Sequence, residues 1–230
     1  HGDRIRRVGL GRDITINLDP ASKAHIRVSR SNGGIENLAI TCTNTLANTV
    51  GLQVSPTAAE IAARTLTQQN YNVFRNLSIT NCSDGIKLQT GPRAASGADS
   101  GIFYNGFYDI HLLDNIRGVY ATNSNTTGSS VNSNNFFNVR VGSTSTRPNT
   151  GFHLEAASGN TFHGIACEGI ANGVTPTATP TCFRIDNPAP VSGADNNDNQ
   201  VFGLRIEANT RDFNIASGAR YNSFYGIIGF

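Results

Sequence analysis

The chain contains no methionine among its 230 residues, and its first residue is His1. A full-length chain begins with Met unless it has been processed, so we expect a fragment of a longer protein. Charged residues make up only 15%, and the formal net charge is +2. Nucleic-acid binding favours a larger and clustered basic excess, whereas only Arg4, Arg6 and Arg7 lie close together here. We therefore expect no nucleic-acid partner.

Long apolar runs are also missing. No segment approaches the ~20 consecutive apolar residues of a membrane-spanning helix, and no signal peptide is visible. The sequence therefore predicts no membrane insertion. It is instead rich in turn formers, with 24 Gly and 27 Asn, and poor in strong helix formers. Recurrent aliphatic and aromatic residues nevertheless exclude a disordered chain.

The four cysteines, Cys42, Cys82, Cys167 and Cys182, lack the close spacing of a zinc site. A disulfide between Cys167 and Cys182 is one possibility. Buried free thiols are the favoured interpretation, because free cysteine is among the most frequently buried residue types.

What the sequence does contain is an internal repeat. After an Asn, apolar residues follow at two, five and seven places, as in Asn72, Phe74, Leu77 and Ile79. The copies begin at Gly33, Asn72, Asn105, Asn134, Asn160, Asn199 and Asn222. Their starts are 39, 33, 29, 26, 39 and 23 residues apart. Repeats of this length indicate a solenoid in which stacked units share one core.

A second, shorter element lies between the copies and alternates apolar and polar residues, as a strand does. Its copies are 51–54, 85–88, 118–121, 151–154, 182–185 and 212–215. Each coil therefore carries at least two strands that cannot bury their apolar faces alone. The sequence predicts an all-β, right-handed parallel β-helix of about seven coils, forming one domain over residues 1–230. We expect residues 1–31 to be an entry segment and residues 32–230 to be the stacked coils.

Three details sharpen this prediction. The repeated Asn side chains are expected to hydrogen-bond to one another as a ladder from coil to coil. The four residues Phe74, Phe107, Phe136 and Phe162 are expected to stack in the core. Residues 57–64 read as a short helix that begins with a capping box. A leucine-rich repeat would have a tighter period, and a β-sandwich would not keep one register through seven copies.

The segments 72–84, 160–168 and 199–207, with the ending Arg220-Tyr-Asn-Ser-Phe-Tyr-Gly226, resemble bacteriophage tailspikes and pre-neck appendage proteins. These belong to the pectate-lyase-like β-helix group, and the resemblance covers about residues 31–230. It implies a homotrimer on a virion tail that acts outside the host cell and binds bacterial surface polysaccharide, capsule or O-antigen. Many members of the group cleave that polysaccharide, by hydrolysis or elimination, and some only bind it. No catalytic motif carries over residue by residue.

The repeat register predicts which side chains face outward, because side chains alternate along a strand. Outward acids then fall on adjacent coils in two pairs, Glu168 with Glu207 and Glu155 with Asp186. Backbones one coil apart are ~4.8 Å apart. Each pair of carboxyl groups could therefore approach the ~5–5.5 Å separation of a retaining glycosidase, or diagonally the ~6.5–9.5 Å of an inverting one. We expect Glu168 and Glu207 as the acid/base pair, and Glu155 and Asp186 as the second choice.

Possible sugar-binding residues lie beside these acids. Arg184, Arg205 and His153 could hold an acidic sugar, and Tyr120 could stack on a sugar ring. The segments 143–150, 171–181 and 187–199, rich in Pro, Gly, Thr and Asn, are expected to be loops flanking this site. His111 and His163 are interpreted as ordinary surface residues.

Two other functions stay open. A polysaccharide lyase would use Lys, Arg or His as the base, and Lys87 beside Tyr120 and His153 is the candidate line for it. A non-catalytic receptor-binding or structural spike would use none of these residues chemically, and outward charges on such a shaft often form a solvated face or a subunit interface. The sequence predicts no cofactor and shows no metal-binding motif of the calcium-loop kinds.

Overall fold

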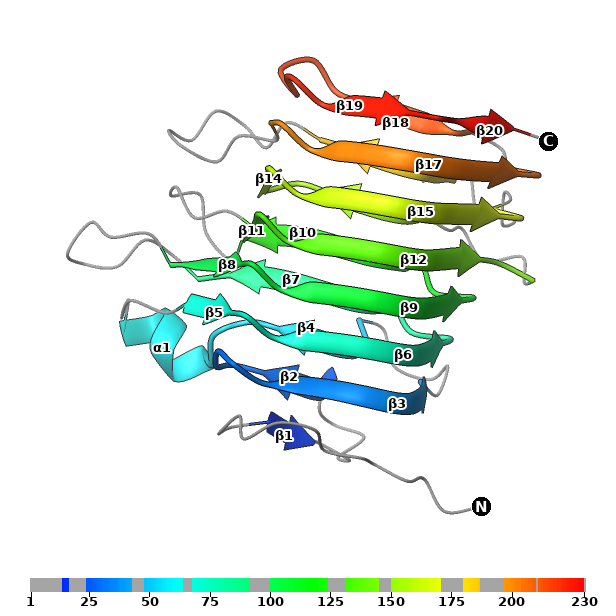
Figure 1. Cartoon of the computed structure of the whole chain (residues 1–230). Coiled ribbons are helices and arrows are strands. Elements are labelled where there is room, and N and C mark those ends of the chain that lie inside the picture. Colours follow the sequence, from blue (N-terminus) through cyan, green and yellow to red (C-terminus); the bar gives the residue numbers. More distant parts are fainter. Residues whose placement is uncertain are drawn as a thin grey trace.

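The computed structural model describes residues 14–16, 24–42, 48–63, 68–91, 100–123, 131–144, 150–170, 180–186, 197–209 and 211–229. These residues form an all-β structure whose strands stack in parallel in three sheets, consistent with the expected β-helix (Figure 1). In each sheet, neighbouring strands come from successive passes of the chain, so the N-terminal and C-terminal strands lie at opposite ends of the stack.

Sheet A carries the repeat that begins with Asn. Its strands, in chain order, are β3 (Gly34–Thr41), β6 (Val73–Thr80), β9 (Gly106–Leu113), β12 (Asn135–Gly142), β15 (Thr161–Glu168), β17 (Gln200–Glu207) and β19 (Ser223–Tyr225), with β20 (Ile228–Gly229) also pairing with β17. All of these pairings are parallel.

Sheet B carries the shorter element. It consists of β1 (Ile14–Ile16), β2 (Ala24–Val28), β4 (Val50–Val54), β7 (Asp84–Thr90), β10 (Arg117–Asn123), β13 (Thr150–Leu154), β16 (Thr181–Ile185) and β18 (Phe213–Ile215). β1 is antiparallel to β2, and the remaining strands are parallel. Because β2 pairs with β4, stacking already begins at Ala24, inside the segment 1–31 that was expected only to lead into the coils.

Sheet C is narrow, with β5 (Gln68–Asn70), β8 (Gly101–Phe103), β11 (Val131–Asn132) and β14 (Ala157–Ser158). The expected helix is present as α1 (Ala58–Ala63). Its capping box is formed, because the Thr57 amide donates to Glu60 Oε2 at 2.7 Å and the Glu60 amide donates to Thr57 Oγ1 at 3.3 Å.

The core between the sheets is dominated by stacked rings. Phe74, Phe107, Phe136 and Phe162 are fully buried, with centroids 4.9, 4.6 and 4.7 Å apart, as the sequence predicts. Sheet B contributes its own stack, and the edge of Phe162 meets both of its rings, those of Phe152 and Phe183, at 5.5 Å. Phe162 therefore joins the cores of the two broad sheets.

The predicted Asn ladder is also present. Each Nδ2 donates to the Oδ1 of the next Asn, at 2.9, 2.8, 3.0, 3.0 and 2.8 Å, along Asn72, Asn105, Asn134, Asn160, Asn199 and Asn222. The backbone amides of these residues donate to the same oxygen atoms. The ladder thus satisfies polar groups in a turn that is largely buried, which would otherwise cost stability.

The irregular apolar spacing of the repeat has a structural cause. Apolar residues at two, five and seven places cannot all face inward in a regular strand, because side chains alternate. At the fourth place the backbone is left-handed, with φ of 51–66° in Asn37, Asn76, Asp109, Asn138, Gly164, Gly203 and Gly226. Asn, Asp and Gly tolerate this conformation. The third place already faces outward by alternation, and the extra residue at the fourth place also stays outside and returns the fifth place to the core.

The expectation of free cysteines is wrong. All four cysteines form disulfides, Cys42 with Cys82 and Cys167 with Cys182. Stacking explains the pairing: Cys42 directly follows β3, and Cys82 lies two residues after the end of the paired strand β6, although 40 residues separate the two cysteines. Cys167 and Cys182 extend from sheets A and B into the same core.

Candidate functional site

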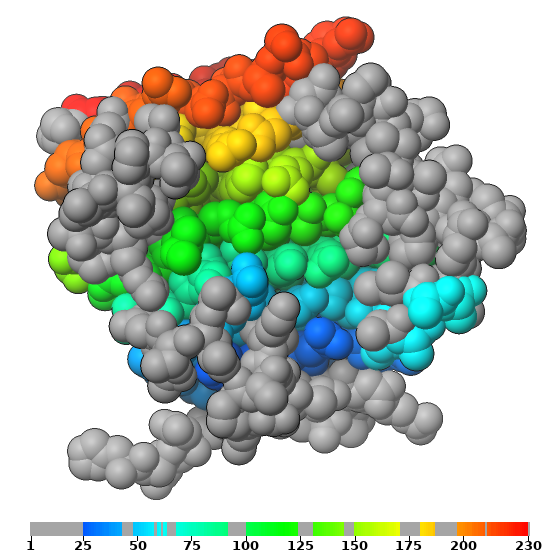
Figure 2. Space-filling model, turned by 180° about the vertical axis from the view of Figure 1, so that it is seen from behind, coloured from blue at the N-terminus to red at the C-terminus, as the bar shows by residue number. Residues whose placement is uncertain are grey.

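Sheet B positions a cluster of polar side chains on its outer face. Sheet B lies behind sheet A in Figure 1, and Figure 2, which views the molecule from that side, shows bands of colour that follow one another in sequence order. Strand register aligns Lys87, Tyr120, His153 and Arg184 in one column, one residue from each coil. Two places further along, Glu155 and Asp186 directly follow β13 and β16. The sequence predicted these columns, and the pairing of the strands agrees with them.

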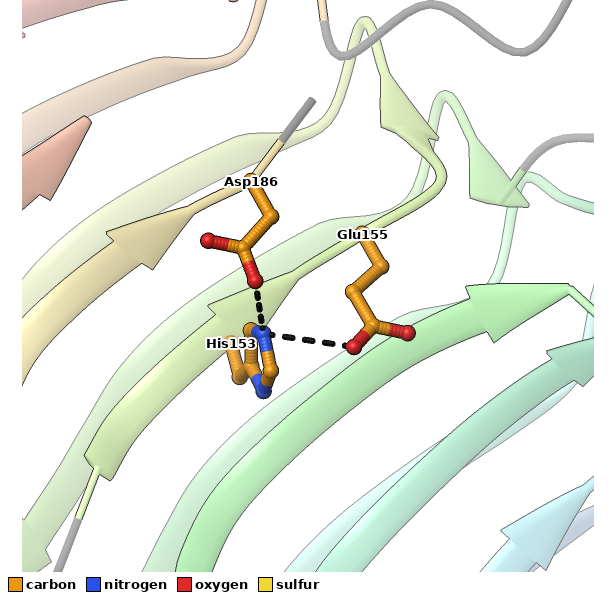
Figure 3. A group of neighbouring side chains, drawn as sticks. All are labelled: His153, Glu155 and Asp186. Atoms are coloured by element: carbon orange, nitrogen blue, oxygen red, sulfur yellow. Dashed lines mark hydrogen bonds and ion pairs between the residues drawn. The ribbon is translucent and has the colours of Figure 1, made fainter. Parts of the chain in front are cut away.

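Both acids of this cluster converge on one imidazole. His153 Nε2 lies 2.8 Å from Asp186 Oδ2 and 3.5 Å from Glu155 Oε1. One oxygen of each carboxylate and a ring nitrogen of His153 all lie within 4.8 Å of one another, and the three side chains point at a common centre (Figure 3). His153 is only 5% exposed although its register position faces outward.

Each carboxylate also accepts hydrogen bonds from other side chains of sheet B. The Tyr120 hydroxyl donates to Glu155 Oε2 at 2.5 Å, and the Thr122 hydroxyl donates to the same oxygen at 2.9 Å. Arg184 Nε lies 3.0 Å from both oxygens of Asp186. These contacts hold the orientation of the two acids relative to His153.

Tyr120 itself is supported on its ring. The ring stacks on His153 with centroids 5.0 Å apart, and the Arg117 guanidinium lies 3.6 Å from the ring centroid. Arg117 in turn donates to Asp84 at 2.5 Å. The ring of Tyr120 therefore already has partners and its hydroxyl contacts Glu155, while the predicted stacking on a sugar stays a prediction.

Burial shifts several pKa values in this cluster. It raises the pKa of Tyr120 to about 12, and the hydrogen bond to Glu155 adds to this shift. Burial lowers the pKa of His153, although the hydrogen bond to Asp186 opposes it. Burial alone would raise the pKa of Asp186, but hydrogen bonds from Arg184 and His153 outweigh it and lower that pKa. Perturbed groups of this kind gather at functional sites more often than elsewhere.

The other carboxylate pair lies on sheet A. Glu168 and Glu207 are register partners on β15 and β17. Arg140 contacts Glu168, and Arg205 lies 3.8 Å from Glu168 and 2.6 Å from Glu207. The pair lines a groove of about 550 Å³ together with His111, Leu113 and Thr144, among others. Each of these glutamates therefore has an arginine partner on a solvent-facing surface.

The predicted site residues thus separate into two groups. Glu155, Asp186, His153, Arg184 and Tyr120 come together on sheet B, whereas Glu168, Glu207 and Arg205 come together on sheet A. They do not form a single cleft. Of the predicted flanking loops, residues 145–149, 171–179 and 187–196 lie outside the described residues.

Sequence reasoning missed two features. Asp84 and Arg117 are register partners in the position just before the Gly of the shorter element, a column that the repeat alignment could have shown. The second feature is an outward stack on sheet A at the third place of the repeat. Its successive rings lie 4.7–5.4 Å apart along Tyr108, Phe137, His163, Phe202 and Tyr225. His163 belongs to this stack, so it is more than an isolated surface residue.

In the part of the chain that the structure describes, no helix is long and apolar enough to cross a membrane. Comparison of the chain with models of protein families, with curated proteins and with solved structures finds no match.

Proposed function

We propose that the parallel sheets form a right-handed parallel β-helix of about seven coils, serving as the glycan-binding and glycan-cleaving shaft of a bacteriophage tailspike. Parallel strands joined by crossover connections are almost always right-handed. The Asn ladder and the continuous ring stack suit a rigid shaft built from consecutive coils. The resemblance of the repeat to tailspikes and pre-neck appendage proteins supports bacterial surface polysaccharide as the ligand.

For the chemistry we propose hydrolysis of a glycosidic bond by Glu155 and Asp186. The observation that carries this choice is the convergence of both carboxylates on His153, with one oxygen of each within 4.8 Å of the other. That upper limit lies just below the ~5–5.5 Å between the carboxyl groups of retaining glycosidases. Asp186, paired with Arg184, suits the nucleophile, and Glu155, held by Tyr120 and Thr122, suits the acid/base.

The pair Glu168 and Glu207 stays a prediction, and we now place it second. Arg140 contacts Glu168, and Arg205 contacts both glutamates, so these carboxylates face arginines and do not converge on a shared histidine as Glu155 and Asp186 do. The groove at this pair suits sugar binding, so it stays in the test below.

The test compares the two pairs in one assay. Glu155→Gln and Asp186→Asn are expected to lower the release of reducing ends from host capsule or O-antigen by ~10²–10⁴-fold, the range for loss of an acid/base group. Glu168→Gln and Glu207→Gln are the matched controls, and we expect near wild-type rates from them. The reverse pattern would move the reaction to sheet A. Wild-type rates in all four variants would exclude both pairs.

A second candidate function is polysaccharide elimination on the same face. The observation that favours it is the group of cations around Tyr120, with Arg117 3.6 Å and Lys87 5.7 Å from its ring centroid. Such cations can neutralise a uronate while Lys87 or His153 removes the proton. Elimination leaves an unsaturated uronate that absorbs in the ultraviolet, whereas hydrolysis leaves only a reducing end. The absence of both products would favour a binding-only spike.

We further propose a homotrimer located on the virion tail and acting outside the host cell. The half-exposed ring stack of sheet A would suit a subunit interface, because aromatic residues are enriched there. The two disulfides suit an oxidising location. Light scattering of the intact protein tests the assembly, and a stable monomer would contradict it.

A further inference from the structure

We propose that His153, Glu155 and Asp186 bind a divalent transition metal ion, with Zn²⁺ as the cation that fits these ligands best. His153 lies in β13, Glu155 directly follows that strand, and Asp186 directly follows the neighbouring strand β16. The parallel pairing of the two strands therefore brings one nitrogen and two oxygen donors together. Figure 3 shows the three side chains pointing toward one another.

The distances suit a small cation. Zinc bonds to His nitrogen and carboxylate oxygen are ~2.0–2.2 Å long, so tetrahedral ligand atoms lie about 3.4 Å apart. His153 Nε2 lies 2.8 Å from the Asp186 oxygen and 3.5 Å from the Glu155 oxygen. The three donor atoms lie within 4.8 Å of one another. Small rotations of the two carboxylates bring all three atoms to zinc distance and leave a fourth position for water or a sugar hydroxyl.

The groups behind the three donors give independent support. Metal-binding side chains are commonly oriented by hydrogen bonds from a surrounding layer of residues. Here Tyr120 and Thr122 both occupy Oε2 of Glu155, which leaves Oε1 facing His153. Arg184 contacts both oxygens of Asp186, including Oδ2, the oxygen that also faces His153. The His153 side chain is only 7% exposed, so its Nε2 is fixed toward the carboxylates rather than toward bulk water.

The donor set also selects the class of ion. Calcium takes 6–8 oxygen ligands and has little affinity for imidazole, so one nitrogen and two carboxylates suit it poorly. Imidazole together with carboxylates suits zinc and its transition-metal neighbours.

Metal binding and the proposed hydrolysis compete for the same carboxylate oxygens. If Glu155 and Asp186 carry out hydrolysis, bound Zn²⁺ therefore inhibits the cleavage, and this consequence rests on the proposed function. The metal site itself does not rest on it, because binding can be measured without any glycan.

The experiment is equilibrium dialysis of the intact protein against Zn²⁺, with metal analysis, followed by titration with Co²⁺ as a coloured substitute. We expect about one Zn²⁺ per chain and a visible Co²⁺ absorption band of the intensity typical of tetrahedral sites. Both signals should be lost in His153→Gln and in Asp186→Asn. His163→Gln is the matched control, because His163 lies in the ring stack of sheet A, and it should bind as the wild type does.

Two variants are needed because His153→Gln replaces a buried ring and could unfold the protein. Asp186→Asn keeps the size of the side chain, so a loss of metal binding in that variant reports on the ligand itself. Zinc binding that is unchanged in both variants would overturn the proposal. Saturation by Ca²⁺ at the same site, competing with Co²⁺, would also overturn the choice of metal class. Cleavage that is unaffected by saturating Zn²⁺, in a protein that binds the metal at His153, would instead contradict the proposed catalytic pair alone.

Discussion

The outer faces of sheets A and B carry the same kind of feature in different surroundings. Each face places two carboxylates one coil apart on neighbouring parallel strands. On sheet A, arginines from the adjacent column pair with Glu168 and Glu207 in a solvent-facing chain. On sheet B, Glu155 and Asp186 instead share a buried histidine and are held by hydroxyl groups and one arginine. Stacking alone therefore brings acids together, and the neighbouring columns decide whether they pair with arginines or converge on a buried histidine.

The largest expected effect comes from replacing a core residue that contacts both sheet A and sheet B. Phe162→Ala deletes the ring that stacks on Phe136 in sheet A and meets Phe152 and Phe183 of sheet B, so we expect a loss of ~3–5 kcal/mol of unfolding free energy. His163→Ala, the next residue, removes only a half-exposed ring and should cost ~0.5–1.5 kcal/mol. Chemical denaturation measures both. Equal losses of unfolding free energy in the two variants would contradict the assignment of His163 to the outer face of sheet A.

A smaller effect is expected from removing a tyrosine hydroxyl on sheet B rather than on sheet A. Tyr120→Phe removes the hydroxyl that donates to Glu155 and keeps the ring stacked on His153. A hydrogen bond to a charged group contributes ~1.5–3 kcal/mol, and we expect the lower end here because Glu155 is partly exposed. The control is Tyr108→Phe in the ring stack of sheet A, which should change stability by less than ~0.5 kcal/mol. Thermal melting measures the stability of both variants. A Tyr120→Phe variant as stable as the wild type would contradict a stabilising hydrogen bond from Tyr120 to Glu155.

The smallest effect concerns the ion pairs. Arg205→Gln breaks solvent-facing pairs with Glu168 and Glu207, and such pairs contribute ~0–1 kcal/mol, less in high salt. Arg184→Gln should cost more, because it releases Asp186 beside the buried His153. Melting temperatures at low and high salt separate the two cases. A stronger salt dependence for Arg184→Gln than for Arg205→Gln would contradict the difference in burial.

Much of the architecture could be predicted because each coil repeats the same local rule. The apolar spacing after Asn72 and Asn105 identified the buried positions of sheet A, and the shorter element identified those of sheet B. The Asn ladder followed from identical side chains at one register. The capping box before α1 was visible as Thr57 and Glu60. These features depend on neighbours that are close in sequence or related by the repeat.

Other features depended on contacts that the repeat does not encode. The disulfide between Cys42 and Cys82 needs two turns to be adjacent in space, although 40 residues separate them. The return of the fifth and seventh places to the core needed the left-handed residue at the fourth place, which a simple alternation of side chains does not predict. Arg117 and Asp84 were missed because they lie just before the aligned element.

The sequence by itself determined that this chain builds stacked parallel strands and which side chains lie in the core, because burial of apolar residues follows a local periodicity. It also determined that two acid pairs would lie on adjacent coils. Only the tertiary structure decided that Glu155 and Asp186 meet at His153 while Glu168 and Glu207 meet arginines. The reason is that these contacts depend on side-chain rotamers and on columns beside the acids, and no periodicity along the chain specifies either.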